Sequence, residues 1–168
     1  ALDINSYRRL NTSDYIIDSV ANGNMSAGHT TSVFQTNWTS GINVNGGNFV
    51  AYCFADIPGY SKAFWATGNG SADGPYIHLG FKPKFILIIG GPAGAYWNII
   101  DLTRSPSNVA NLSLHPNTSG VENSTYAAID VTSQRFKCRN YNDNINYTGY
   151  GIIGIAFADV PSKYALAR

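Results

Sequence analysis

The sequence TGNGSADGPYIHLGFKP at residues 67–83 is the stretch from which we interpret the fold. Its four glycines and two prolines predict consecutive turns, and the alternating residues 76–79 predict a short strand. Gly70 or Asn69 is expected at a positive φ, and Asp73 is expected to form an Asx-turn. Because hard cations bind clustered oxygens, a calcium ion at Asn69 and Asp73 is the alternative to a purely structural turn.

Outside this stretch, the apolar residues also come in short runs separated by clusters of Gly, Asn, Pro and Ser. No long segment keeps the i, i+3, i+4, i+7 apolar spacing of an amphipathic helix. Strands are expected at residues 15–18, 31–36, 49–56, 63–66, 76–79, 84–89, 97–101, 126–131, 135–139 and 152–159. The pattern predicts an all-β antiparallel β-sandwich of jelly-roll type with little or no helix, in one domain over residues 1–168.

A degenerate internal duplication is the firmest pattern in the chain. The motif FADIP at residues 54–58 recurs as FADVP at residues 157–161, and each copy ends an apolar run. The matches that precede it are NVN at 43–45 with NIN at 144–146, TS at 31–32 with TS at 132–133, and IID at 16–18 with IID at 99–101. We interpret the chain as half-repeats at residues 11–58 and 93–161, separated by a joint at residues 59–92.

The spacing of the matched motifs locates the main difference between the half-repeats. The offset rises from 83 residues at the IID pair to 101 at the TS pair, so the second half-repeat holds about 18 extra residues between 101 and 132. An insertion of this length on a sandwich is expected to form a surface loop, and such loops often carry binding residues. We therefore place the candidate binding surface in residues 103–125 and expect the fold to survive shortening of this insertion.

The composition argues against two classes of partner. Charged residues make up 12% of the chain and the formal net charge is +1, with Lys and Arg scattered along the sequence. Such a chain offers no basic surface that would attract a nucleic-acid backbone. The longest apolar run, residues 85–89, is far shorter than the roughly 20 residues that span a bilayer. We therefore expect no nucleic-acid binding and no membrane insertion.

The residues that commonly carry chemistry form no recognisable catalytic or metal-binding pattern. Cys53 lies in the apolar run FVAYCFADI, so we interpret it as a small buried residue rather than as a disulfide partner of Cys138. His29, His78 and His115 do not stand at metal-ligand spacing, and no Gly-x-Ser-x-Gly sequence is present. The sequence therefore predicts neither an enzyme nor a cofactor.

Aromatic and polar residues around the insertion allow two interpretations. An ion pair between Asp101 and Arg104 would fix the insertion loop, which is a structural role. The alternative is a polar groove with an aromatic floor, because sugar hydroxyls hydrogen-bond to planar polar groups and sugar C–H faces stack on rings. The candidate ligand-binding residues are Trp65, Tyr76, Trp97, Asp101, Arg104, Asn108, Asn117 and Glu122.

Several motifs occur together in one order along the chain. They are YSK at 60–62, TGNG at 67–70, DGPY at 73–76, GFKPKF at 80–85, the residues Trp97, Asp101, Arg104 and Asn108, LHPN at 114–117, the residues Glu122, Phe136, Lys137 and Arg139, and AFAD at 156–159 with Pro161. In combination they resemble a tail-fibre-like domain found in virion proteins of tailed bacteriophages, many of them marine. The resemblance covers about residues 11–161, nearly the whole chain.

This resemblance implies a function that the composition and motifs alone do not. It implies a non-enzymatic virion protein at the host-facing end of a tail fibre or related appendage, which recognises a glycan on the host surface. It also implies a homotrimer or another homo-oligomer, other virion proteins as partners, and a place in the extracellular virion. The alternatives are a head-decoration or fibre-joining protein that binds no receptor, and a carbohydrate-binding module of a secreted enzyme.

Overall fold

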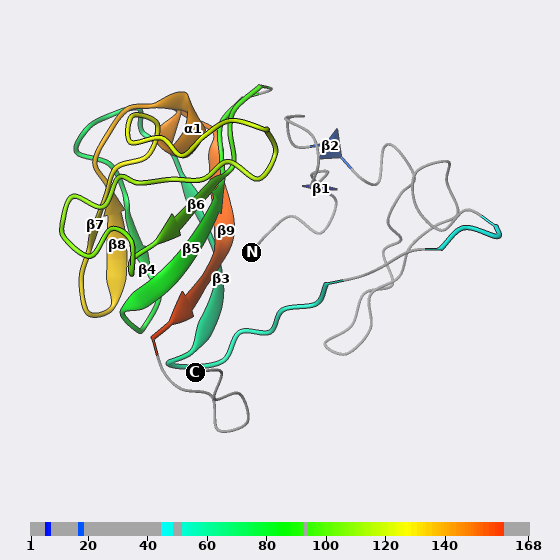
Figure 1. The fold of residues 1–168 in the computed structure, drawn as a ribbon, viewed down its shortest axis with the longest axis horizontal. Helices are drawn as coiled ribbons and strands as arrows, with labels where there is room; N and C mark the ends of the chain where they lie inside the picture. The colour runs from blue at the N-terminus through cyan, green and yellow to red at the C-terminus, as the bar shows by residue number, and fades with distance from the viewer. Residues whose placement is uncertain (1–5, 8–16, 19–44, 49–51, 93, 160–168) are drawn as a thin grey trace.

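The computed structural model describes residues 6–7, 17–18, 45–48, 52–92 and 94–159. Two antiparallel sheets form the body of the molecule (Figure 1). The larger sheet has the strand order β3-β9-β5-β6 and the smaller sheet the order β4-β8-β7. The predicted all-β antiparallel sandwich is therefore confirmed.

The strands of the body follow the apolar runs of the sequence. The larger sheet contains β3 (Ser61–Thr67), β5 (Pro83–Ile89), β6 (Asn98–Asp101) and β9 (Gly151–Ala158). The smaller sheet contains β4 (Tyr76–His78), β7 (Ile129–Val131) and β8 (Arg135–Cys138). One turn of helix, α1 (Asp143–Asn146), precedes β9, and the short strands β1 (Ser6–Tyr7) and β2 (Ile17–Asp18) pair with each other.

The predicted strands from residue 63 onward each coincide with an observed strand. Of the earlier ones, the range 15–18 contains β2, whereas the range 31–36 and residues 49–51 lie outside the described residues. The prediction of a strand at 49–56 is wrong for residues 52–56, which are exposed and pair with no strand.

The core lies between the two sheets because side chains alternate along each strand. In β5, Ile86 and Ile88 are fully buried, whereas Phe85 and Leu87 on the opposite face are half-buried. The rings of Phe64 and Phe136 meet edge to face across the core at 5.2 Å between centroids. The other buried residues of this core include Ile77, Ile100, Ile129, Cys138, Ile145, Ile152 and Ala156.

The stretch that precedes β4 folds as the turns its glycines predict. Gly70 has a φ of +62°, as expected, and a Cβ on Gly68 would lie 2.2 Å from the carbonyl oxygen of Tyr147. The expected Asx-turn belongs to a different residue, since the Ser71 backbone N–H donates to Asn69 Oδ1 at 3.1 Å. Asp73 forms no such turn because the residue two positions on is Pro75, which has no backbone N–H to donate.

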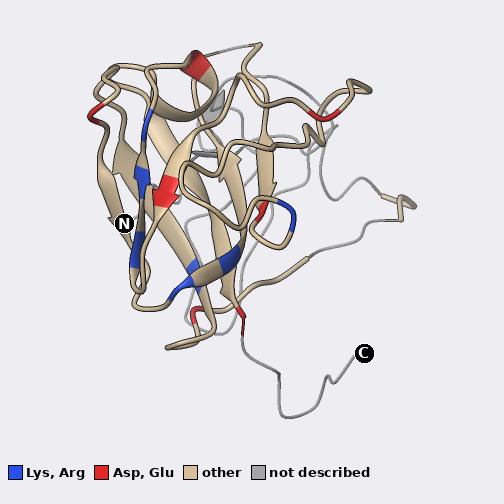
Figure 2. Cartoon of the chain, turned by 60° about the vertical axis from the view of Figure 1, so that its left-hand side comes forward, with Lys and Arg blue, Asp and Glu red and all other residues tan. Residues whose placement is uncertain are grey.

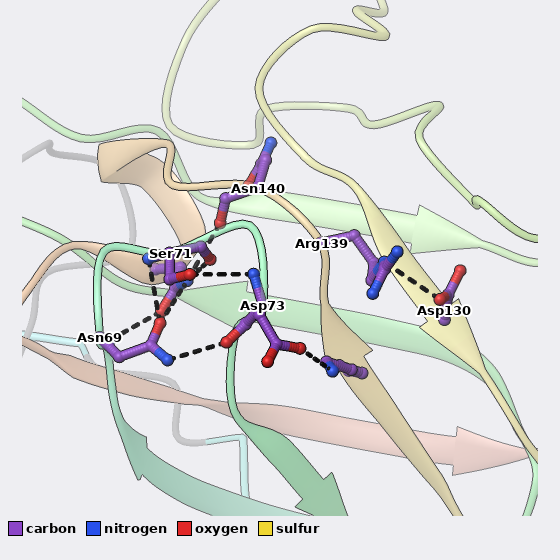
Figure 3. A network of polar contacts seen from close by, with 8 residues as sticks. Asn69, Ser71, Asp73, Asp130, Arg139 and Asn140 are labelled. Carbon is purple, nitrogen blue, oxygen red and sulfur yellow. Dashed lines mark hydrogen bonds and ion pairs between the residues drawn. The ribbon is translucent and has the colours of Figure 1, made fainter.

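A buried asparagine from α1 holds these turns in place. The side chain of Asn146 is fully buried, and its Nδ2 lies within 3.0 Å of oxygens of Asn69, Ser71 and Asn140. Its Oδ1 accepts a hydrogen bond from the Asn69 backbone N–H at 2.9 Å. These contacts converge between the turns and the end of β8 (Figure 3). The turns are therefore attached to the second half of the chain through polar contacts.

Residues 59–92 do more than join two half-repeats, because they supply β3, β4 and β5 to the two sheets. Most of the first half-repeat lies outside the described residues, so the duplication stays a prediction.

The insertion at residues 103–125 is built into the body of the molecule. Its backbone pairs at isolated positions with the strands beside it, as Leu114 does with Ile99 and Ala110 with Ile129. Ala110, Ser113 and His115 are all buried. The segment forms no named strand and most of its residues are exposed, as expected of a surface loop, but it also supplies buried side chains. Shortening it should therefore damage the fold, against the expectation from the sequence.

Candidate functional site

The predicted aromatic floor does not form. Trp97 is only 1% exposed, beneath the insertion, so its ring cannot face a ligand on the surface. Trp65 in β3 and Tyr76 in β4 are both exposed, but they belong to different sheets of the sandwich. Because the outer faces of two packed sheets point apart, these two rings do not share a groove.

The predicted ion pair between Asp101 and Arg104 is wrong. The turn after β6 brings the Asp101 carboxylate back onto its own backbone, where it accepts the Thr103 N–H at 2.8 Å. Arg104 instead pairs with Glu122 at 2.6 Å across the insertion. Two of the predicted residues are therefore brought together, and their contact links two parts of the insertion.

The two predicted asparagines hold backbone segments together. The amide of Asn108 accepts from the Val131 N–H at 2.8 Å and donates to the Val131 carbonyl at 2.9 Å. The amide of Asn117 accepts from the Trp97 N–H at 2.9 Å and donates to the Ala95 carbonyl at 3.2 Å. Each amide uses both its donor and its acceptor inside the protein, which favours a structural role.

The oxygens of the calcium alternative are also occupied. Asn69 Nδ2 donates to the Asp73 carbonyl at 3.0 Å, and the Asp73 carboxylate forms an ion pair with Lys137. The hydrogen bond and the charge of Lys137 lower the pKa of the Asp73 carboxyl, and the same contact raises the pKa of Lys137. Within the described residues, no three His, Cys, Asp or Glu side chains are placed to share a metal ion.

The two cysteines are unpaired, as predicted, but the burial predicted for Cys53 is wrong. Cys53 is exposed because residues 52–56 pair with no strand. Cys138 is fully buried in the core, and this burial raises the pKa of its thiol to about 12.

A groove of about 540 Å³ lies where three segments distant in sequence meet. They are the loop before β6, the residue Tyr126 before β7, and the start of α1. The residues lining it are Pro92, Gly94, Ala95, Tyr96, Tyr126, Tyr141, Asn142, Asp143 and Asn144. Its volume falls in the range of about 300–1,000 Å³ that is common for small-ligand sites.

Asparagines tie the helical wall of the groove to the loop before β6. Asn142 caps α1 by accepting from the backbone N–H of Asn144 at 2.9 Å. The Asn144 side chain then accepts from the Tyr96 N–H at 2.6 Å, and buried Asn98 donates to the carbonyls of Tyr96 and Asn144. The two walls are also close at Gly91, where an added Cβ would lie 1.9 Å from the Asp143 carbonyl oxygen. These contacts make the groove a preformed feature of the fold.

Three aromatic rings pack together at the groove. Tyr96 lies 5.0 Å from Tyr126 and 5.0 Å from His115 between ring centroids, and His115 lies 5.6 Å from Tyr126. His115 is 6% exposed, and its Nδ1 lies 3.0 Å from the Trp97 carbonyl oxygen. A carbonyl only accepts, so Nδ1 donates to it, and Nε2 is buried without a hydrogen-bond partner among the described residues. On the opposite wall, Tyr141 is 72% exposed.

Positive and negative side chains both occur over the body of the molecule. Lys and Arg positions follow one another along β8 and the residue after it, whereas Asp and Glu positions lie on several elements (Figure 2). Several of them pair, as Arg139 does with Asp130 at 3.2 Å and Lys84 with Asp159 at 3.1 Å. The groove itself contains one acidic residue, Asp143, among its lining side chains. Its character is therefore aromatic and polar rather than strongly charged.

A family model for a domain of unknown function, DUF7483, matches residues 2–161. The chain belongs to the DUF7483 family. No curated protein and no solved structure matches it. The family description mentions no virion, so the resemblance of this DUF7483 domain to phage tail-fibre domains stays a prediction. Among the described residues, no helix is both long and apolar enough to cross a bilayer.

The groove of this DUF7483 domain was not predicted from the sequence. The signal nearest to it is the run YNDNIN at residues 141–146, where a tyrosine precedes three asparagines and an aspartate. This run was interpreted only as part of the repeat, through its match to residues 43–45. Nothing in the spacing connects it to Tyr96 or Tyr126, which lie far away in sequence and meet it only in the folded chain.

Proposed function

We propose that this DUF7483 domain is a glycan-binding domain and that the groove of Tyr96, Tyr126 and Tyr141 is its binding site. The observation that carries the proposal is the placement of tyrosine rings and amide and carboxylate side chains around one preformed groove. Tyrosine presents an apolar ring face with a polar tip, and Asn142 and Asp143 offer hydrogen-bond partners beside it. This combination suits a sugar, which has apolar C–H faces and a rim of hydroxyl groups.

Tyr141 is the residue on which binding should depend most. Its side chain is more exposed than those of the other groove tyrosines, so it can stack on a sugar ring without a rearrangement of the protein. Tyr96 and Tyr126 are half-buried and packed against His115, which fixes their orientation. Fixed rings bind with a smaller entropy cost than mobile ones. The groove therefore combines a rigid floor with one exposed ring.

The biological setting we propose is the virion of a tailed bacteriophage, with the domain in a tail fibre or related appendage. Single sites of this kind bind sugars modestly, and several copies on one appendage would gain avidity. The resemblance of the motifs at residues 60–85 and 114–117 supports this setting. The order of the neighbouring open reading frames tests it, because a cluster of tail genes supports the appendage and an adjoining catalytic domain supports a secreted enzyme.

The binding test uses the full chain on a glycan array, followed by titration calorimetry with any glycan that binds. Tyr141→Ala should reduce affinity at least tenfold, because it removes the exposed stacking ring. Tyr76→Ala is the matched control, since Tyr76 is an exposed tyrosine outside the groove. Loss of binding in Tyr76→Ala alone would return the site to the residues predicted from the sequence. A natively assembled protein that binds no glycan would refute the proposal and favour a purely structural virion protein.

A further inference from the structure

Residues 52–56, which we call the arm, leave the body of the molecule just before β3 (Figure 1). Tyr52 is 76% exposed and Phe54 is 62% exposed, and Cys53 between them is also exposed. Large apolar side chains are usually buried, and this arm carries two of them at alternate positions. Such a segment has the pattern of a strand without its neighbours.

A second copy of the arm's residue pattern forms a paired strand elsewhere in the chain. At an offset of 103 residues, the arm matches residues 155–159, which form the end of β9 and the residue after it. There, Ala156 is fully buried and Phe157 is half-buried, and β9 lies between β3 and β5. Cys53 corresponds to Ala156 and Phe54 to Phe157. The arm therefore has the sequence of a central strand, yet it pairs with none.

A hairpin between the arm and β3 begins and then stops. Ile57 and Ser61 exchange two backbone hydrogen bonds of 2.9 and 3.0 Å across the turn. The next pair of an antiparallel hairpin would join Ala63 to Ala55. Instead, the Ala63 N–H donates to the Asp56 carboxylate at 2.7 Å. Because Asp56 takes this donor, Ala55 forms no backbone pair with Ala63. The Ala55 carbonyl accepts from the Ser61 hydroxyl at 2.7 Å instead, and the Phe54 ring meets Phe157 edge to face at 5.9 Å. The arm therefore contacts its own sheet without adding a strand to it.

The edge of β3 opposite β9 presents backbone groups with which another strand can pair. In the described residues, β3 ends one side of the larger sheet, and β9 is the one strand paired with it. Residues that alternate with Ser61 and Ala63 direct their backbone groups to the free side, and these include Trp65 and Thr67. Both side chains are exposed. A free edge with exposed side chains is a template for another strand.

The face next to this edge is apolar. Beyond Ala63 and Trp65, the outward side chains of the larger sheet include Leu87, Ile153 and Ile155, which are half-buried. In a strand added to the edge, Tyr52 and Phe54 would share one face and Cys53 the other. The aromatic side of the arm would then extend the apolar face, and the small side chain would lie on the side of the core.

We propose that the arm of one copy of this chain pairs with the free edge of β3 in a second copy. Each chain carries both the arm and the β3 edge with which the arm would pair. The hydrogen bond of Asp56 disfavours this pairing within one molecule. Backbone hydrogen bonds along β3 would supply affinity, and the aromatic side chains would supply specificity. Exchange of arms in this way gives a closed dimer or ring without any additional partner.

The test uses Cys53 as a natural probe in the arm. The full chain is treated with a thiol reagent at several protein concentrations, and the mass is measured by light scattering under the same conditions. Cys138 provides the internal reference, because it is fully buried and reacts only after unfolding. We expect an oligomer in which Cys53 reacts at least tenfold more slowly than in the monomer. Its reactivity should rise as dilution converts the oligomer into the monomer.

Three results would overturn the proposal. The first is a monomer in which Cys53 is protected, which would mean that the arm pairs within one chain. The second is a monomer in which Cys53 reacts at every concentration. The third is an oligomer in which Cys53 remains fully reactive. Phe54→Lys should weaken association at least tenfold, whereas Tyr141→Lys, at an aromatic that is also exposed, should leave the mass unchanged. Association that is lost in Tyr141→Lys and kept in Phe54→Lys would place the interface at the groove. Because this readout is mass, it does not depend on glycan binding.

Discussion

Replacement of Asn146 by alanine should destabilise the fold by about 3 kcal/mol, which is roughly a 150-fold change in the folding equilibrium. The side chain is fully buried and contacts Asn69, Ser71 and Asn140. A buried polar group left without a partner costs about 1–3 kcal/mol, and three partners would be affected. The estimate stays near the lower end because Asn69 is exposed and water can replace one lost contact.

Urea unfolding of the full chain, followed by tryptophan fluorescence, measures this loss. Asn146→Asp separates hydrogen bonding from volume, since it keeps the size of the side chain and the acceptor for the Asn69 N–H. It should also be strongly destabilised, because its second oxygen would face the Ser71 and Asn140 carbonyls. Asn111→Ala is the control at a half-buried asparagine whose side chain makes no hydrogen bond in the described part of the chain. A loss below about 1 kcal/mol in Asn146→Ala would refute the reasoning.

Two further predictions concern the groove wall and the turns. Gly91→Ala should lower the melting temperature and weaken glycan binding, because the added Cβ would lie 1.9 Å from the Asp143 carbonyl oxygen. Gly94→Ala is the control, also at positive φ but in open space, and it should lower the free energy of unfolding by only about 1 kcal/mol. Asp73→Asn should be less stable than the parent chain at neutral pH, and urea unfolding should show the difference shrinking as the pH falls below 3.8. The sign follows because Lys137 lowers the pKa of Asp73 below its ordinary value of 3.8, so this contribution is present above that value and lost in acid.

Each of these two predictions has an outcome that would contradict the structure. Equal melting temperatures for the two glycine variants would mean that the groove wall is not closely packed. A stability difference for Asp73→Asn that is unchanged down to the pH at which carboxylates are protonated would mean that the ion pair with Lys137 contributes nothing in solution. An exposed pair of this kind is open to screening, so the measurement belongs at low ionic strength.

The strands of the body were predictable because their signal is local. Alternation at residues 84–89 separates Ile86 and Ile88 from Leu87, and glycines and prolines mark the turns on either side. Such patterns report only on near neighbours in the chain. They identify a strand and its two faces, but they do not say which strands lie beside it or what covers each face.

The site was not predictable for the same reason. Trp97 was predicted to line the aromatic floor of an open groove, whereas in the fold the insertion covers it. Asn98 is fully buried, against the usual preference of asparagine, and its Nδ2 donates to the carbonyls of Tyr96 and Asn144. Contacts of this kind join residues 46 positions apart and leave no trace in local spacing.

The order of the strands in the larger sheet has a consequence for how the protein is made. The strand β9 lies between β3 and β5, and its Phe157 pairs with Ser61 on one side and Phe85 on the other. The centre of the sheet is therefore the last of its strands to leave the ribosome. Until it emerges, β3 has no native neighbour in this sheet and β5 has only β6, so one edge of each strand is open to other chains. Folding should be slow, late in synthesis and sensitive to chaperones.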